Sequence, residues 1–290
     1  MTYNQLWHQL TPPYTDGEAK AIVRLVLQRA FGLSLADILC GKVSELSEHE
    51  QDFLEEMILR LQKGEPVQYV LGEEEFCGRL FKTDARALIP RPETEELCNR
   101  IIQTCNCPPA ASKPLAGCSQ LPLSLLDIGT GTGCIAITLA LELVEARVTA
   151  WDVSAAALSL AKENAQRLGA KVSFEHCDIL STQSDERMWN LIVSNPPYVC
   201  EREKQDMLPH VLEHEPALAL FVPDDDPLRF YRAISNYAAQ HLKAGGQIWF
   251  EVNEAYAQEV CELLEKAHFI DIFIINDGFD KPRFVKGQHA

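Results

Sequence analysis

The sequence predicts an α/β protein with a doubly wound, mostly parallel sheet, preceded by a small helical domain. Residues 1–72 carry apolar residues at helical spacing and lack the apolar runs that are typical of strands. From Leu123 onward, short apolar runs alternate with amphipathic stretches, as strands and helices do in a parallel sheet. We therefore expect a helical domain over residues 1–72, a linking β-hairpin over residues 73–88, and a larger α/β domain over residues 89–290.

The N-terminal region is expected to hold three helices, each with its own boundary signals. One spans residues 19–31, with an apolar stripe on one face and Gly32 as its stop. A short second helix covers residues 34–40. A third opens at Ser47, which forms a capping box with Glu50, and runs to about residue 63.

The larger domain is expected to begin with a helix that starts at Pro92 and ends near residue 104. Residues 106–122 hold four prolines and few large apolar side chains, which predicts a surface loop. The strands expected after it cover residues 124–128, 147–153, 172–177, 190–194, 247–252, 270–276 and 283–286. The helices between them are expected at residues 134–143, 154–168, 227–243 and 254–267.

Composition narrows the class of function. The net charge of −16 argues against a protein that grips naked DNA or RNA and favours a protein, peptide or small-molecule substrate. The chain lacks a run of 18 apolar residues and a secretory signal, so we expect no membrane association and a cytoplasmic location. Ten cysteines are then expected to be reduced. Four of them gather within 21 residues without zinc-ligand spacing, so no metal is expected: Cys98, Cys105, Cys107 and Cys118.

A Gly-rich turn follows the first strand of the larger domain, in the stretch Asp127-Ile128-Gly129-Thr130-Gly131-Thr132-Gly133. Gly129, Gly131 and Gly133 allow a tight turn and the close approach of a ligand to the backbone. The spacing differs from the fingerprint of dinucleotide sites, and Asp127 would repel a phosphate but suit an ammonium group. A purely structural turn is the alternative.

Two further acids end the next two strands. Asp152 can accept hydrogen bonds from two ribose hydroxyls, and Asp178 from an adenine amino group. Either can instead be an ordinary strand-ending acid or helix cap. Three acids at three successive strand ends fit a cationic nucleoside such as S-adenosylmethionine better than a dinucleotide.

The stretch Asn195-Pro196-Pro197-Tyr198 follows a buried strand. A planar NH₂ group needs two acceptors at fixed angles, and the Asn195 side-chain oxygen and the Pro196 carbonyl can be those two. Prolines add no competing donor, and Tyr198 can stack on a flat group. If strand order reverses beside the first strand, Asn195 faces the Gly-rich turn across a crevice. A rigid turn without a binding role is the alternative.

The chain resembles the family of release-factor glutamine methyltransferases. The resemblance is carried by Asp127–Gly133 and Asn195–Tyr198, and by residues 64–69 (Gly-Glu-Pro-Val-Gln-Tyr), 88–95 (Leu-Ile-Pro-Arg-Pro-Glu-Thr-Glu), 215–216 (Glu-Pro), Asp277, Asp280 and Arg283. It implies N5-methylation of the glutamine in the G-G-Q motif of class 1 peptide chain release factors. S-adenosylmethionine would be the donor and S-adenosylhomocysteine the product. The N-terminal domain would help to dock the release factor.

The resemblance also implies roles for single residues. The cofactor would be held by Asp127, Gly129, Thr130, Gly131, Thr132, Gly133, Asp152, Asp178, Ile179 and Asn195. The substrate amide would be held by Asn195, Pro196, Pro197 and Tyr198, of which Asn195, Pro196 and Tyr198 are the expected catalytic residues. The chain departs from the family pattern at Ile179, where an aromatic residue is common, and at Asn253, where glycine is expected.

Two rival functions remain open. A DNA or RNA adenine-N6 methyltransferase would use the same Asn-Pro-Pro-Tyr clamp on a flipped base, although the acidic composition speaks against it. A binding module that kept the fold without the chemistry is the other, and the complete clamp and glycine turn speak against that. Arg91 and Glu93 either order the domain junction, lie near the cofactor, or form a surface ion pair at a capped helix start.

Overall fold

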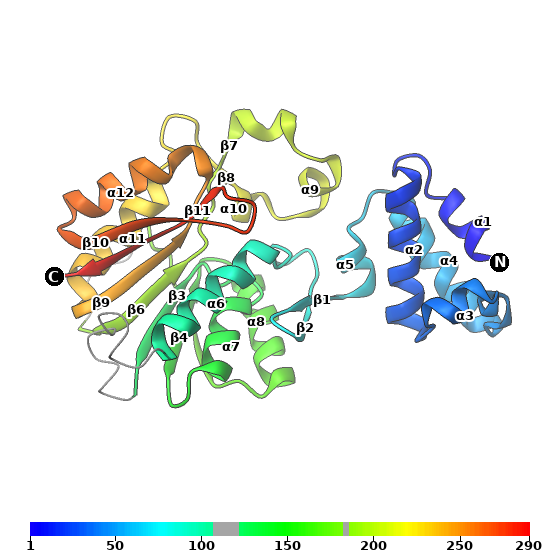
Figure 1. Ribbon diagram of the computed structural model, residues 1–290, viewed down its shortest axis with the longest axis horizontal. Coiled ribbons are helices and arrows are strands. Elements are labelled where there is room, and N and C mark those ends of the chain that lie inside the picture. The colour runs from blue at the N-terminus through cyan, green and yellow to red at the C-terminus, as the bar shows by residue number, and fades with distance from the viewer. Residues whose placement is uncertain (107–121, 182–185) are drawn as a thin grey trace. The chain divides into compact units, whose positions relative to one another are not determined.

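The computed structural model describes residues 1–106, 122–181 and 186–290, which divide into two compact units. The N-terminal unit comprises Met1–Glu74, Thr83–Ala85 and Met207–Glu215. The sheet unit comprises Glu75–Lys82, Arg86–Asp206 and Pro216–Ala290. Figure 1 shows the helices of the first unit and the sheet of the second.

The N-terminal unit is helical, as the sequence predicts. Its elements are α1 (Tyr3–His8), α2 (Asp16–Phe31), α3 (Leu35–Leu39), the 3₁₀ helix η1 (Lys42–Glu45), α4 (Glu48–Gln62) and α5 (Val67–Leu71), with α9 (Pro209–His214) from later in the chain. The capping box predicted at Ser47 and Glu50 is confirmed, since each residue accepts a hydrogen bond from the other's backbone N–H. Apolar residues of α1, α2 and α4, among them Leu6, Leu27 and Leu61, form one buried core.

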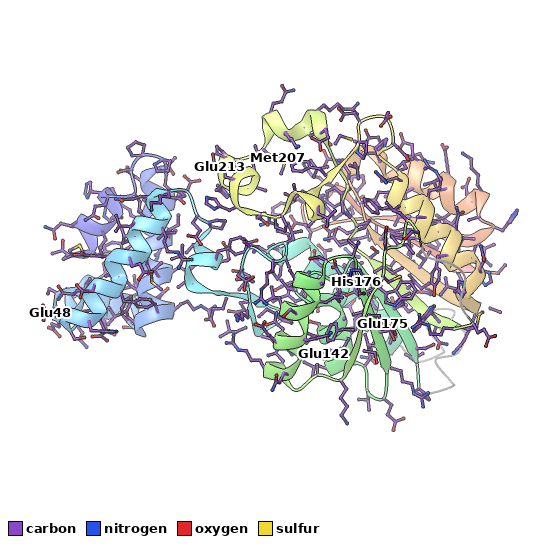
Figure 2. The ribbon with its side chains drawn as sticks, turned by 180° about the vertical axis from the view of Figure 1, so that it is seen from behind. Glu48, Glu142, Glu175, His176, Met207 and Glu213 are labelled. Atoms are coloured by element: carbon purple, nitrogen blue, oxygen red, sulfur yellow. The ribbon has the colours of Figure 1, made fainter. Side chains whose placement is uncertain are left out.

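Residues Met207–Glu215 belong to the N-terminal unit although they lie far along the chain. Figure 2 shows Met207 and Glu213 on this short segment. Within the same unit, a Cβ on Gly64 would lie 4.0 Å from His214 Nε2. No local pattern indicates this grouping, because it depends on contacts between residues about 150 positions apart in the sequence.

A short hairpin, β1 (Glu73–Phe76) and β2 (Arg79–Lys82), lies within the predicted linker, and most of it belongs to the sheet unit. The rest of this unit opens with a helix and then alternates strands with helices. The helices that follow are α6 (Pro92–Asn106), α7 (Cys134–Glu142), α8 (Ala155–Leu168), α10 (Ala217–Leu220), α11 (Arg229–His241) and α12 (Ala257–Lys266), with the 3₁₀ helices η2 (Glu201–Asp206) and η3 (Glu254–Tyr256). The strands are β3 (Ser124–Ile128), β4 (Arg147–Asp152), β5 (Val172–His176), β6 (Trp189–Ser194), β7 (Val199–Cys200), β8 (Phe221–Val222), β9 (Leu242–Glu251), β10 (Phe269–Asn276) and β11 (Pro282–His289).

The central sheet has seven strands in the order β10-β11-β9-β6-β3-β4-β5. β9, β6, β3, β4 and β5 run parallel, and β11 pairs antiparallel with both β9 and β10. The mostly parallel, doubly wound sheet is therefore confirmed. The chain moves outward from β3 to β4 and β5, then returns to the other side of β3 with β6. This reversal is the switch point at which ligands bind in such folds.

Both faces of the sheet are buried, because successive strand residues point to opposite sides. Leu125 and Leu191 pack against α6 and α7 in one core. The next residues, Leu126 and Ile192, pack in a second core with side chains of α11 and α12. Helices cover both faces of the sheet (Figure 1), so a ligand site in this unit is expected beyond the carboxyl ends of the parallel strands.

Several boundaries differ from expectation: α2 begins at Asp16 and β11 ends at His289, each three residues beyond its predicted limit, and a larger difference lies between α11 and β9. The helix predicted to run to residue 243 ends at His241, and β9 begins at Leu242, five residues before the predicted strand start at residue 247. The early start comes from pairing of Leu242 with Trp189 across a register shift in β6. Two glycines in this stretch favour a turn, but pairing with the neighbouring strand β6 extends β9 across them.

Several other predictions can be placed. The loop expected over residues 106–122 lies, apart from its two end residues, outside the described residues, as do Cys107 and Cys118. The eight cysteines that the structure describes are free thiols. Within residues 1–106, 122–181 and 186–290, no helix is long and apolar enough to span a membrane. The same ranges contain no cluster of three metal-ligating side chains.

Candidate active site

The Gly-rich turn joins β3 to α7. The backbone N–H groups of Gly129 and Thr130 both donate to the carbonyl of Trp151 at the end of β4, at 2.9 and 3.0 Å. Gly129 and Gly131 have positive φ angles of 77° and 55°, which side-chain-bearing residues rarely adopt. The turn is thus folded back on the neighbouring strand, and its outer face is bare backbone.

Gly133 caps α7 and has no room for a side chain. Its φ is 82°, and a Cβ there would lie 2.9 Å from Ile137 Cδ1 and 3.1 Å from Ala161 Cβ. The third glycine therefore serves the packing of α7 against α8. It does not line the pocket described below.

Asp127 lies behind the turn. Its side chain is 1% exposed and accepts hydrogen bonds from the Thr130 hydroxyl at 2.6 Å and from the Ala136 N–H at 3.2 Å. Burial raises the pKa of this carboxyl to about 7, against the lowering effect of these two bonds. Asp127 braces the turn from inside, so its predicted contact with a cofactor stays a prediction.

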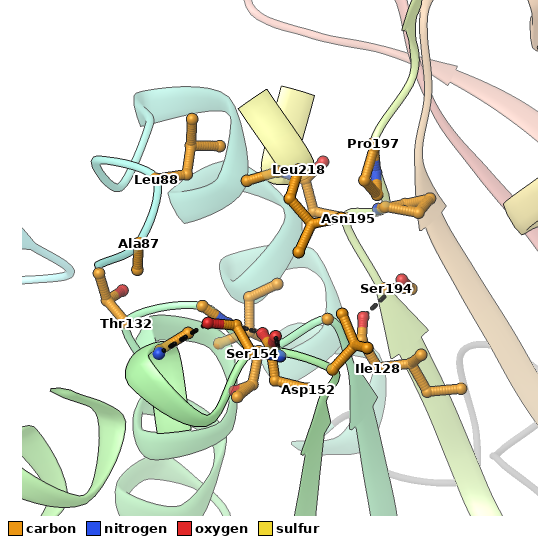
Figure 3. Close-up of a pocket in the computed structure, with 18 of the residues that line it drawn as sticks. Ala87, Leu88, Ile128, Thr132, Asp152, Ser154, Ser194, Asn195, Pro197 and Leu218 are labelled. Atoms are coloured by element: carbon orange, nitrogen blue, oxygen red, sulfur yellow. Dashed lines mark hydrogen bonds between the residues drawn. The ribbon is translucent and has the colours of Figure 1, made fainter. Parts of the chain in front are cut away.

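The other two acids, Asp152 and Asp178, lie at the carboxyl ends of β4 and β5. Asp152 accepts from the backbone N–H of Gly131 at 2.9 Å and of Ser154 at 2.8 Å, which fixes its carboxylate between the turn and the start of α8 (Figure 3). Asp178 follows β5 and accepts from Leu180 N–H at 2.9 Å, an Asx turn. Burial raises the pKa of Asp152, mainly opposed by its backbone hydrogen bonds.

The end of β6 is tied to the end of β3. The Ser194 hydroxyl donates to the carbonyl of Ile128 at 2.6 Å (Figure 3). The next residue, Asn195, has its carbonyl oxygen 4.0 Å from the position of a Cβ on Gly129. The start of the Asn-Pro-Pro-Tyr stretch therefore lies directly beside the Gly-rich turn, as the switch-point argument predicts.

These elements enclose one pocket, entirely within the sheet unit (Figure 3). Of the predicted site residues it is lined by Gly129, Thr130, Gly131, Thr132, Asp152, Asp178, Ile179, Asn195, Pro196 and Pro197. The structure brings these ten together and leaves three out of the lining: Asp127, Gly133 and Tyr198. The Tyr198 ring packs instead against the second core.

Several lining residues were not singled out from the sequence. The loop before α6 contributes Ala87, Leu88, Ile89 and Pro90, and α10 contributes Leu218 (Figure 3). Residues 88–90 belong to the stretch 88–95 that carries the family resemblance, but no site role was predicted for them. Arg91, for which a place near the cofactor was one of the predictions, also lines the pocket. Thr94 could have been noticed, since it lies in the stretch Pro92-Glu93-Thr94-Glu95 that marks the start of α6.

A buried polar chain supports Asn195. Its Nδ2 donates to the Thr94 hydroxyl at 3.1 Å, and that hydroxyl donates to Glu251 Oε2 at 2.7 Å. The Tyr198 hydroxyl donates to Glu251 Oε1 at 3.3 Å. Burial is the main cause that raises the pKa of Glu251 to about 7 and that of Tyr198 above its ordinary value. Sequence reasoning missed Glu251, the last residue of β9.

One departure from the family pattern has a structural role here. Asn253, where glycine was expected, accepts from the Ala255 N–H at 3.0 Å and caps η3. Its Nδ2 donates to the Tyr198 carbonyl at 3.4 Å. An asparagine at this position thus helps to hold the chain that follows the two prolines.

The site can hold an extended ligand between a carboxylate-lined end and an amide-bearing end. Asp152 and Asp178 offer acceptors to hydroxyl or amino groups, while the bare turn allows a ligand close to the backbone. At the other end, Asn195 and the two prolines offer acceptors for a planar NH₂ group. An electrophile over the turn and a nucleophile at Asn195 would face each other.

Two family models match parts of the chain. A family model described as the PrmC N-terminal domain matches residues 8–72, and one described as the methyltransferase small domain matches residues 111–220. Among solved structures, a methyltransferase from Pyrococcus furiosus superposes with a TM-score of 0.49 and 17% identity, covering 74% of this chain and 90% of that one.

Curated relatives match nearly the whole chain. A release factor glutamine methyltransferase of Bacteroides thetaiotaomicron is 44% identical over 273 residues, covering 94% of this chain and 93% of its own. That of Flavobacterium psychrophilum is 38% identical over 282 residues, covering 97% and 96%. The likeness spans both units, including the helical N-terminal region. The chain therefore belongs to the family of release factor glutamine methyltransferases.

Proposed function

We propose that this protein methylates the side-chain amide nitrogen of the glutamine in the G-G-Q motif of class 1 peptide chain release factors, with S-adenosylmethionine as donor. The observation that carries the proposal is the position of Asn195, at the switch point beside the Gly-rich turn of a family member. We place the protein in the cytoplasm, where release factors act.

The lining fits the donor. Asp152 is held rigidly by two backbone N–H groups and keeps lone pairs for ribose hydroxyls. Asp178 and Ile179 lie together as acceptor and apolar wall for an adenine ring. Gly129 and Gly131 present bare backbone to the methionine part. When bound, the donor supplies an electrophilic methyl group on a positively charged sulfur.

The protein's own part in the reaction is positioning and polarisation. The Asn195 oxygen and the Pro196 carbonyl each accept one N–H of the substrate amide, which leaves its nitrogen lone pair directed at the turn. As positive charge develops on that nitrogen, both acceptors stabilise it. Holding the nucleophile in line is worth up to about 7–11 kcal/mol of the barrier. No covalent bond to the enzyme is required: the new N–C bond would replace the donor's S–C bond, and one of the two N–H protons of the amide would leave to solvent.

The two units divide the work. The sheet unit holds every residue of the pocket, and the helical N-terminal unit helps to dock the protein substrate. The acidic composition of the chain, −16 overall, suits a substrate with basic, RNA-facing surfaces. Direct binding of nucleic acid is not part of the proposal.

The test offers labelled donor to the purified enzyme with a release factor, with the same factor whose G-G-Q glutamine is replaced by alanine, and with duplex and single-stranded DNA. Label should appear only on the intact release factor, and mass spectrometry should place it on that glutamine. Label on adenine in DNA, with none on the release factor, would instead support the nucleic-acid methyltransferase reading.

A further inference from the structure

We propose that Thr94 and Glu251 are positioning residues that fix which end of the Asn195 side-chain amide faces the substrate. They do so by orienting a chain of hydrogen bonds behind the pocket. The inference rests on the proposed function for its reading of the substrate as an amide, but the hydrogen-bond chain itself belongs to the protein alone.

The residues of this hydrogen-bond chain come from three elements that are far apart in sequence. Thr94 lies in the first turn of α6, Asn195 follows β6, and Glu251 ends β9. All three belong to the sheet unit. Thr94 is 3% exposed and Glu251 1% exposed, so water does not compete for these bonds. Asn195 and Thr94 also line the pocket, whereas Glu251 does not.

Counting hydrogens gives the chain a direction. A threonine hydroxyl has one hydrogen, and here it is donated to the Glu251 carboxylate at 2.7 Å. The Thr94 oxygen can then only accept from Asn195. Of the two ends of the Asn195 amide only the nitrogen can donate, so Nδ2 is held toward Thr94 at 3.1 Å. The Asn195 oxygen is left as the end that accepts from a substrate N–H.

Loss of the negative charge on Glu251 removes this direction. A protonated carboxyl can donate to Thr94, whose own hydrogen then bonds an oxygen of Asn195. The amide would turn over and present NH₂ to the pocket, where two donors would face each other. The clamp therefore works only with its carboxylate ionised.

Several charged and titratable groups face Glu251. The Arg283 guanidinium on β11 favours the ionised form, while Glu93 on α6 disfavours it. Arg283 is itself bonded through Nε to Asp277 at 3.2 Å. The Tyr198 hydroxyl donates to the carboxylate, and the Tyr231 hydroxyl of α11 donates to the Glu251 backbone carbonyl at 3.1 Å. Burial outweighs these partners and raises the pKa of Glu251 to about 7, so its charge changes near neutral pH.

The first experiment removes the hydroxyl of Thr94 and restores it. Thr94→Val keeps shape but not the hydrogen bond, and kcat on the release factor should fall about 10- to 100-fold, as when a partner that orients a ligating group is lost. The dissociation constant for the donor should stay within about threefold, because Thr94 acts on the acceptor side. Thr94→Ser should recover most of the lost kcat.

Thr104→Val is the matched control, since Thr104 lies on the same helix and, among the described residues, its hydroxyl donates within that helix to the Arg100 carbonyl at 2.9 Å. It should leave kcat unchanged. A Thr94→Val enzyme that keeps wild-type kcat would overturn the proposal, as would a loss that Thr94→Ser does not recover.

The second experiment tests the direction of the chain by pH. In the wild-type enzyme kcat should rise with pH through about 7, as Glu251 loses its proton. Glu251→Gln cannot titrate, so this rise should disappear while the protein stays folded. Persistence of the same rise in Glu251→Gln would contradict the proposal.

A measurement without substrate separates this proposal from the proposed function. The side-chain amide signal of Asn195, identified by its absence in Asn195→Ala, should shift in Thr94→Val and not in Thr104→Val. It should also move with pH near 7 in the wild type and not in Glu251→Gln. If these shifts occur and no release factor is methylated, the proposed function fails and the hydrogen-bond chain stands. If the release factor is methylated and these shifts do not occur, the proposed function stands and the proposed role of the hydrogen-bond chain fails.

Discussion

Ser194 and Ile128, 66 residues apart in sequence, are joined by a 2.6 Å hydrogen bond between the Ser194 hydroxyl and the Ile128 carbonyl. The bond links the last residues of β6 and β3, the two strands on which the two halves of the site begin. Both residues are buried. The separation between the Gly-rich turn and Asn195 is therefore set by a rigid contact one residue before each of them.

Loss of this bond should lower stability and kcat while the site still binds the donor. We expect Ser194→Ala to lower the free energy of unfolding by about 1–2 kcal/mol, the usual cost of a buried hydrogen bond. It should also reduce kcat more than it weakens donor binding. Urea denaturation and steady-state kinetics check both effects. The control is Ser173→Ala on the exposed face of β5, and an equal effect there would show that the bond itself is unimportant.

Asn195→Ala should abolish one of the two acceptors for the substrate amide. We expect kcat to fall about 10²- to 10³-fold, as in other sites that lose one group stabilising transition-state charge. Donor affinity measured by calorimetry should change little, since the carboxylates proposed to bind ribose and adenine, Asp152 and Asp178, lie elsewhere in the pocket. An equal loss of donor affinity would mean that Asn195 serves the cofactor and not the amide.

Gly133→Ala should lower the free energy of unfolding more than an ordinary glycine-to-alanine replacement does. Its Cβ would lie 2.9 Å from Ile137 Cδ1, and its φ is positive. Overpacking adds about 1–3 kcal/mol to the penalty of about 1–2 kcal/mol for a side chain in the left-handed region. Gly169→Ala carries only the second penalty, because its φ is also positive but nothing lies within 4 Å. Thermal unfolding of the two variants should differ accordingly; similar losses would show that α7 and α8 relax freely.

Asp127 should make stability depend on pH. Its folded pKa of about 7 lies above the ordinary value of 3.8. Its contribution to stability is therefore complete below about pH 4 and is lost as pH rises through 7. With rising pH, we expect the free energy of unfolding of Asp127→Asn to increase relative to that of the wild type, by up to about 4 kcal/mol at pH 8.

Comparing the two proteins by urea denaturation at pH 5 and pH 8 isolates this group from Glu251, which titrates in the same direction. The difference between them should grow from pH 5 to pH 8. A difference in unfolding free energy that stays constant between the two pH values would show that the folded protein does not raise the pKa of Asp127.

The sequence by itself determined the elements whose signals are local. The capping box at Ser47 and Glu50, the serine cap and glycine stop of α8, and the Gly-rich turn after β3 were all readable, because each depends on residues a few positions apart. The strand and helix alternation also predicted the doubly wound sheet, and with it the meeting of Asn195 and the Gly-rich turn at the switch point.

Only the tertiary structure decided what surrounds these residues. It placed Thr94 and Glu251 behind Asn195, turned the Tyr198 hydroxyl toward Glu251, and put Asp127 under the turn. Such contacts join residues 101 and 157 positions apart. They arise from how helices settle on a sheet, and burial then sets the ionisation of the carboxyl groups. Neither effect leaves a periodic or local trace in a single sequence.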